Sequence, residues 1–197
     1  YVGMDQCKVC HSQIHSTFIH TGMGKSMGVA TKKKSSGNFE GHPVVFDSLS
    51  NLSYAPQWKG DDLWISEFRL DGDDTTHVWR QSIDYVIGSG QHTNSHLFQI
   101  NGYVYQAPLT FYTQDGKWDL PPGYENGANS RFSRIIGLEC MSCHNAMPTE
   151  FQLGSENAFT QIPNGINCER CHGLGNLHIK NNNNEKSTNT SKHKEYP

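Results

Sequence analysis

The stretch HLFQINGYVYQ, from His96 to Gln106, places two short β-prone runs on either side of the dipeptide Asn101-Gly102. Asn-Gly is the dipeptide that most readily supplies the two positive φ angles of a type I′ turn, which joins the strands of a tight β-hairpin. We therefore predict an antiparallel hairpin with strands at residues 96–100 and 103–106.

A second strand, turn, strand pattern precedes this hairpin. LWISEFRL (Leu63 to Leu70) leads into Asp71-Gly72, and HVWRQSIDYVI (His77 to Ile87) follows. Both patterns lie in a cysteine-free stretch, residues 31–132, which we expect to be a β-rich linking region. Helical signal is confined to short stretches outside the two patterns, at residues 5–18 and 131–143.

All six cysteines of the chain lie outside this region, in three Cys-x-x-Cys-His motifs. Such a motif attaches a c-type haem, because the two thiols add to the porphyrin vinyl groups and the adjoining imidazole reaches the iron. Chance would give far fewer than one such run in a chain of this composition. The attachment residues expected for three covalently bound haems c are Cys7, Cys10, His11, Cys140, Cys143, His144, Cys168, Cys171 and His172.

Zinc binding and disulfide bonding are the competing interpretations of six paired cysteines. A zinc ribbon has roughly 15–20 residues between its two pairs, whereas 24 residues separate Cys143 from Cys168. Neither alternative accounts for a histidine directly after every pair. Haem attachment is therefore the favoured interpretation.

The composition fits a chain that packs around cofactors. Only 35% of the 197 residues are hydrophobic, and porphyrins are large apolar bodies on which side chains can pack. We expect an α+β fold: a mostly irregular, haem-packed chain with short helices at the motifs and a small antiparallel β-hairpin region in the middle. The expected segments of this one haem-centred domain are residues 1–30 (first haem), 31–132 (linking region), 133–179 (second and third haems) and 180–197 (a polar, Asn-rich tail).

The net charge of −3 provides no basic surface for nucleic acid. No apolar run reaches the 18 or more residues that a membrane-spanning helix needs, so we expect no transmembrane segment. Because bacteria attach haem to such motifs outside the cytoplasm, we expect an exported protein, periplasmic or at the cell surface, whose signal peptide preceded Tyr1 and was removed.

Each haem iron needs a fifth and a sixth ligand, and the motif histidines His11, His144 and His172 supply the fifth. Eleven histidines less these three leave eight, so we expect several to serve as sixth ligands in bis-histidine haems. The candidate sixth ligands are, in order, His178, His92 and His42, with Met23 for the first haem.

Local context ranks these candidates. His178 follows a Gly-Leu-Gly turn that can fold it back toward a haem, and His92 follows Gly88-Ser89-Gly90, where glycine lets a porphyrin approach the backbone. His42 precedes a proline, and the thioether of Met23 would raise the reduction potential relative to imidazole. For each candidate the alternative is an unligated surface or core residue. The histidines expected to be unligated are His15, His96 and His193.

The runs GLECMSCH (137–144) and INCERCHGLGNLH (166–178) resemble the multihaem c-type cytochromes with the signature I-x-C-E-x-C-H-G-x-G-x-x-H. The opening YVG, the run TGMGKSM and the stretches IDYVIGSGQH, YQAPLTFY and WDLPPGYE are similar to the same family, over residues 1–180. The resemblance implies that His178 is a distal ligand. The chain departs from many relatives by having Met23 where they have a distal histidine, and relatives often continue with further haem motifs, so this chain is expected to be part of a longer protein.

Three functions follow from these observations. The first is electron transfer between redox proteins, or to an extracellular acceptor, by a non-enzymatic three-haem carrier whose irons are fully ligated. The second is a haem oxidoreductase with one open iron, which Arg80, Arg131 or Arg134 could line. The third is a homo-oligomer or filament subunit in which the haems of neighbouring copies form a conduit.

Overall fold

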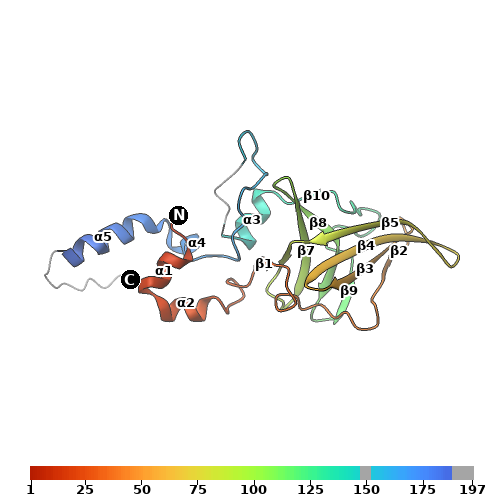
Figure 1. Cartoon of the computed structure of the whole chain (residues 1–197), viewed down its shortest axis with the longest axis horizontal. Helices are drawn as coiled ribbons and strands as arrows, with labels where there is room; N and C mark the ends of the chain where they lie inside the picture. The colour runs from red at the N-terminus through yellow and green to blue at the C-terminus, as the bar shows by residue number, and fades with distance from the viewer. Residues whose placement is uncertain (147–151, 188–197) are drawn as a thin grey trace.

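The computed structural model describes residues 1–146 and 152–187. Strands form a compact body, and helices made from both ends of the chain extend from it (Figure 1). The helices are α1 (Met4–Cys10), α2 (Ser12–Phe18), α3 (Leu138–His144), α4 (Glu169–His172) and α5 (Gly175–Ser187). The strands are β1 (Met27–Val29), β2 (Val45–Asp47), β3 (Leu52–Lys59), β4 (Asp62–Asp71), β5 (Asp74–Ile83), β6 (Tyr85–Ile87), β7 (Thr93–Ile100), β8 (Tyr103–Tyr112), β9 (Lys117–Asp119) and β10 (Arg134–Ile135).

The strands form two antiparallel sheets. One sheet has the order β1-β6-β7-β8-β10, with β9 also paired to β8, and the other has the order β2-β3-β4-β5. Both predicted turns lie where expected: Ile100 pairs with Tyr103 across Asn101-Gly102, and Asp71 pairs with Asp74 across a turn that contains Gly72. Asn101 and Gly102 both have positive φ, as a type I′ turn requires.

The main core lies between the two sheets. Tyr54 and Ile65 of the smaller sheet pack with Phe98 and Leu109 of the larger sheet in one buried cluster. A second cluster lies on the outer face of the larger sheet, where Met141 of α3 is fully buried. The sheet thus has apolar side chains on both faces, and α3 is fixed to its outer face.

The expected fold class is wrong. The described part of the chain is mostly β-sheet, with ten strands in two sheets, and is not an irregular haem-packed chain with a small hairpin region. The low hydrophobic fraction was attributed to haem packing, but alternating strands need few apolar residues to build a core. In β4, Leu63 and Ile65 face inward and are buried while their neighbours are not.

Two of the predicted elements have different boundaries in the structure. The predicted strand at 77–87 breaks at Asp84, so that β5 ends in one sheet and β6 begins in the other. Asp84 donates its backbone N–H to Leu97 and accepts the N–H of Gln99 with its carboxylate, which holds the chain at this crossing. The predicted helix at 131–143 is wrong in its first half, because Arg134 and Ile135 pair with β8 and the helix begins at Leu138.

The first part of the expected polar tail is helical. Helix α5 continues to Ser187, although the composition after residue 180 gave no helical signal. The rest of the tail, with His193, lies outside the described residues.

His96, expected to be unligated, lies in the core between the sheets. It is fully buried, its Nδ1 lies 3.0 Å from the backbone oxygen of Leu109, and its ring lies 5.1 Å from that of Trp118. Burial lowers the pKa of His96 to about 4, so the ring is neutral at physiological pH.

Candidate haem-attachment sites

Each cysteine pair lies on or at the start of a short helix. Helices α1 and α3 contain the first and second pairs, and α4 begins directly after Cys168 and contains Cys171. Residues three apart lie on the same face of a helix, so both thiols of a pair can reach one edge of a porphyrin. The second cysteine of each pair is exposed and the first is half-buried, and all six thiols are free: Cys7, Cys10, Cys140, Cys143, Cys168 and Cys171.

The first motif histidine faces a histidine from the other end of the chain. The ring centres of His11 and His178 are 6.1 Å apart, and the ring planes differ by 24°. A metal–imidazole bond is about 2 Å long and the ring centre lies about 1 Å behind the nitrogen, so two imidazoles on opposite sides of one iron have centres about 6 Å apart. The spacing of His11 and His178 therefore fits two axial ligands of one haem.

A cavity of about 430 Å³ lies around this histidine pair. One wall comes from α1 and α2, including Ile14 and His15, and the other comes from α4 and the start of α5, including His172 and Leu174. The chain thus brings parts of the first and third motifs to one cavity.

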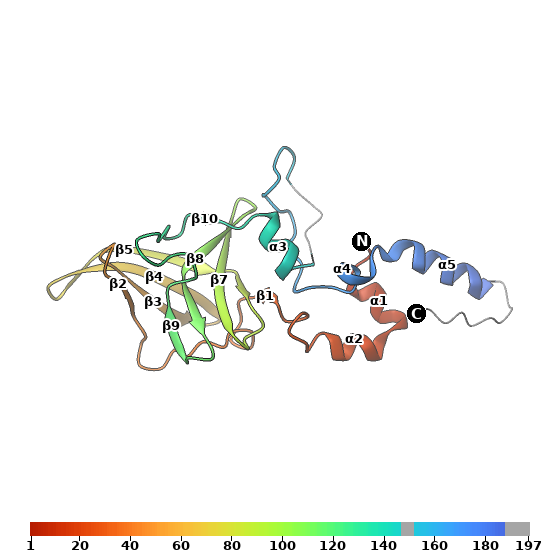
Figure 2. The same ribbon diagram turned by 180° about the vertical axis from the view of Figure 1, so that it is seen from behind.

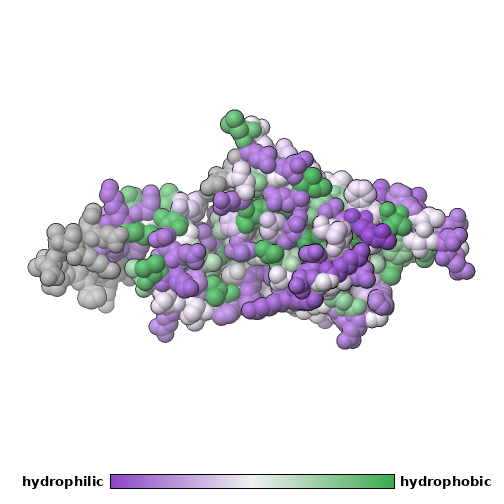
Figure 3. Space-filling view, in the orientation of Figure 1, coloured by the Kyte–Doolittle hydropathy of each residue, from purple (hydrophilic) through white to green (hydrophobic). Residues whose placement is uncertain are grey.

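Apolar side chains around this cavity are unusually exposed. Ile14 and Leu174, which line the cavity, expose 65% and 58% of their surface. Val9 of α1 and Leu177 of α5 expose 78% and 66%. Hydrophobic residues reach the surface of the helical part of the molecule in Figure 3. A group of apolar side chains left in water normally has an apolar partner, and a covalently attached porphyrin would provide one. The free thiols, the histidine pair and these apolar walls fit haem c.

Glu169 links the third motif to the start of the chain. Its carboxylate accepts hydrogen bonds from the backbone N–H groups of Val2, Gly3 and Gly175, each at 2.9 Å at its shortest. Burial alone would raise the pKa of Glu169, but these three donors outweigh it and hold the pKa below its usual value.

We expect acid to weaken this link. Because the folded-state pKa of Glu169 is depressed, its stabilising contribution is complete above the unfolded-state pKa and is lost as the pH falls through the folded-state pKa. Glu169→Gln should cost about 1–3 kcal/mol of unfolding free energy at pH 6, as hydrogen bonds to a charged group do, and much less at pH 3. Chemical denaturation of both proteins at the two pH values measures this difference. An equal cost at both pH values would contradict the role given to the charge.

The first cysteines of the first and third motifs lie near each other. Burial first, and then the neighbouring Cys168, raises the pKa of Cys7, and both cysteines line the same cavity. In the second motif, burial and the nearby Glu139 raise the pKa of Cys140.

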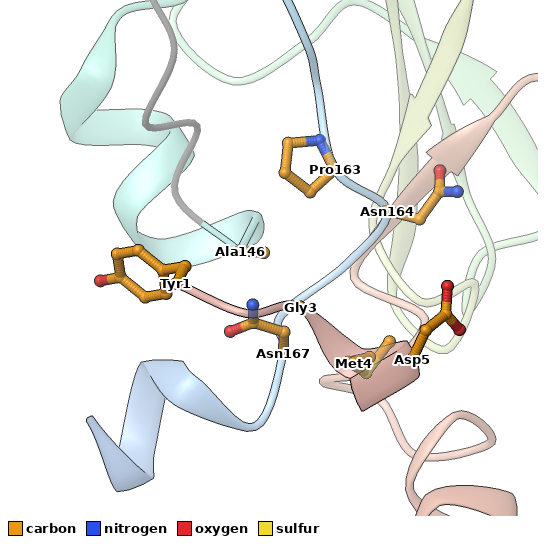
Figure 4. Close-up of a pocket in the computed structure, with 8 residues that line it drawn as sticks. All are labelled: Tyr1, Gly3, Met4, Asp5, Ala146, Pro163, Asn164 and Asn167. Atoms are coloured by element: carbon orange, nitrogen blue, oxygen red, sulfur yellow. The ribbon is translucent and has the colours of Figure 1, made fainter. Parts of the chain in front are cut away.

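The second motif is held by backbone contacts on both sides. Ser26 donates its hydroxyl to the backbone oxygen of His144 at 2.7 Å. Arg170 of α4 donates from Nε and Nη2 to the backbone oxygen of Ser142, at 3.1 and 2.6 Å. A smaller cavity of about 310 Å³ lies where Met4, Ala146 and Asn167 meet, so segments flanking all three motifs converge there (Figure 4).

The other candidate sixth ligands do not line the cavity between His11 and His178. His92 is exposed in the turn between β6 and β7, and His42 is exposed in the loop before β2. The side chain of Met23 is half exposed, and its backbone oxygen accepts the N–H of Ile166 at 3.1 Å. Of the four candidates, the structure brings His178 to a motif histidine.

Two residues of this site lacked a predicted role. His15, which was expected to be unligated, lines the cavity, and its position four residues after His11 on the same stretch is a signal that sequence reasoning could have used. Glu169 has no such signal, because its partners at the start of the chain become neighbours only through folding.

The described ranges contain no cluster of three or more His, Cys, Asp or Glu side chains that could hold a metal ion. Haem needs no such cluster, because the porphyrin supplies its own ring of nitrogen ligands and the protein adds the axial ones. Within the same ranges, no helix is long and apolar enough to cross a membrane.

Comparison with known proteins agrees with the cysteine motifs. The sequence pattern of the cytochrome c554 and c-prime family matches residues 125–173, which contain the second and third motifs. This match supports a c-type cytochrome that carries electrons. No curated protein and no solved structure matches the chain.

Proposed function

We propose that the chain is a three-haem c-type cytochrome that transfers electrons between redox partners outside the cytoplasm. The main support is the pair formed by His11 and His178, whose ring centres have the spacing of two ligands on one iron. The thiols of Cys7 and Cys10, which precede His11 in the same motif, are free. The family match over the second and third motifs supports extending this interpretation to Cys140, Cys143, Cys168 and Cys171.

Bound haem supplies the one-electron chemistry of its iron. The residues of the chain bind the haems and shape their surroundings. The cysteines would hold each porphyrin covalently, and His11 and His178 would both bind the iron of the first haem, which would leave no place for a substrate there. Two imidazoles favour a lower reduction potential than an imidazole with a thioether. Ile14 and Leu174 would pack on a bound porphyrin and shield it from water.

The closed carrier is distinguished from a haem enzyme by optical spectra of the purified protein, oxidised and reduced, with carbon monoxide added to the reduced form. We expect low-spin bands for all haems and no change with carbon monoxide, because every iron of a closed carrier has two protein ligands. A carbon monoxide shift on one haem would reveal an open iron and would favour the oxidoreductase alternative.

A further inference from the structure

We propose that the third haem lies between the first and the second, so that the haems follow the order first, third, second in space, with the first and third as a close pair. This inference rests on the proposed three-haem function. It concerns where this chain places its own attachment residues.

The attachment points of the first and third haems are adjacent. Cys7 and Cys168 line the same cavity, together with His11, His172 and His178. Because a thioether bond would join each sulfur to its own porphyrin, two cysteines on one cavity bring the edges of the two porphyrins close together.

Hydrogen bonds in the folded chain hold the first and third motifs next to each other. The carboxylate of Glu169, the residue after Cys168, accepts the N–H groups of Val2 and Gly3, which directly precede α1. Its side chain is almost fully buried. Helix α4 is therefore held against the start of α1, and the positions of the two motifs do not depend on a mobile loop.

Helix α4 also contacts the second motif. Arg170 lies between Cys168 and Cys171, and its guanidinium donates twice to the backbone oxygen of Ser142, which lies between Cys140 and Cys143. Two opposite views both place α4 between α1 and α3 (Figures 1 and 2). The third motif thus touches both other motifs.

This order differs from the order of the motifs in the sequence. The first and second haems become the ends of the row. The second haem lies next to the β-sheets through α3, and the first lies at the far side of α4. Electron exchange between the two ends would then depend on the third haem.

The test uses three variants of the full chain that each lack one cysteine pair: Cys7→Ala/Cys10→Ala, Cys140→Ala/Cys143→Ala and Cys168→Ala/Cys171→Ala. Haem quantification first establishes two haems per chain in each. Haems in contact couple their Soret transitions and give a bisignate circular dichroism signal. We expect the strongest signal in the variant without the second pair, and none in the variant without the third. An equal or stronger signal when the third pair is removed would overturn the order.

A second measurement needs no variant and applies even if a variant does not mature. In the fully reduced intact protein, proton nuclear Overhauser contacts between haem methyl groups report which porphyrins touch. Contacts between the first and third haems support the proposal, and contacts between the first and second haems alone contradict it. Three haems without a first–third contact would refute this inference and leave the proposed function intact, whereas fewer than three haems would refute the proposed function itself.

Discussion

His178→Ala should open the first haem to carbon monoxide, so that one haem of the three binds it in the reduced protein while the wild type binds none. The imidazole of His178 lies across the cavity from His11 at a distance that fits one shared iron. Alanine cannot reach the iron, which leaves an axial position free. The reduced-minus-carbon-monoxide difference spectrum, scaled to the haem content, measures the fraction that reacts.

Two further variants make this result specific. His15 lines the same cavity and could replace the missing ligand, so the double variant His15→Ala/His178→Ala should bind carbon monoxide at least as fully. His42→Ala, at an exposed histidine away from the cavity, should bind none. If neither cavity variant binds carbon monoxide, His178 is not a ligand of the first haem.

Arg131→Met should reduce the unfolding free energy by about 1–3 kcal/mol, because it removes the opposite charge and the hydrogen bonds that Arg131 gives to a buried carboxylate. The side chain of Glu67 is completely buried, and Arg131 contacts both of its oxygens, at 2.9 Å from Nε in one case. His77 lies 3.6 Å from the same carboxylate and is half exposed. Methionine keeps the length of the arginine stem and removes only the charge and its hydrogen bonds.

Chemical denaturation followed by far-ultraviolet circular dichroism measures this loss. The matched control is Lys117→Met, which breaks an exposed ion pair with Asp119 and should leave the unfolding free energy almost unchanged, because exposed ion pairs contribute little. A further variant, Glu67→Gln/Arg131→Met, should recover part of the loss, since a neutral amide is less costly to bury than an unpaired carboxylate. If Arg131→Met and Lys117→Met were equally stable, Arg131 would not stabilise the buried carboxylate of Glu67.

Local signals predicted the parts of the fold that depend on neighbouring residues. Asn101-Gly102 specifies its turn through its own φ angles, and the hairpin forms as expected. The sheet order depends on distant pairs, such as Met27 with Ile87 and Arg134 with Gln106. No turn residue encodes such pairs, so the extent of the sheets was missed.

Backbone packing explains glycines near two of the candidate ligands. Gly88, before His92, was interpreted as room for a porphyrin, but a Cβ there would lie 2.2 Å from the backbone oxygen of Thr93. Near Met23, a Cβ at Gly165 would lie 2.3 Å from the backbone oxygen of Gly24. In both places glycine permits two backbone segments to approach closely.

The cysteine motifs could be found from the sequence because each is complete within five residues. The pairing of His178 with His11 could not be derived from spacing, because it requires the start and the end of the described chain to meet. The resemblance to multihaem cytochromes singled out His178 as a distal ligand without naming its haem. Folding supplies that partner by holding Glu169 against Val2 and Gly3.

The most direct test of three covalent haems is the intact mass of the purified protein after denaturation, combined with haem quantification. The expected result is the mass of the polypeptide plus three haems, with three haems per chain in solution. A chain that carries fewer than three haems, or whose cysteines are joined as disulfides or hold zinc, would contradict the proposed function.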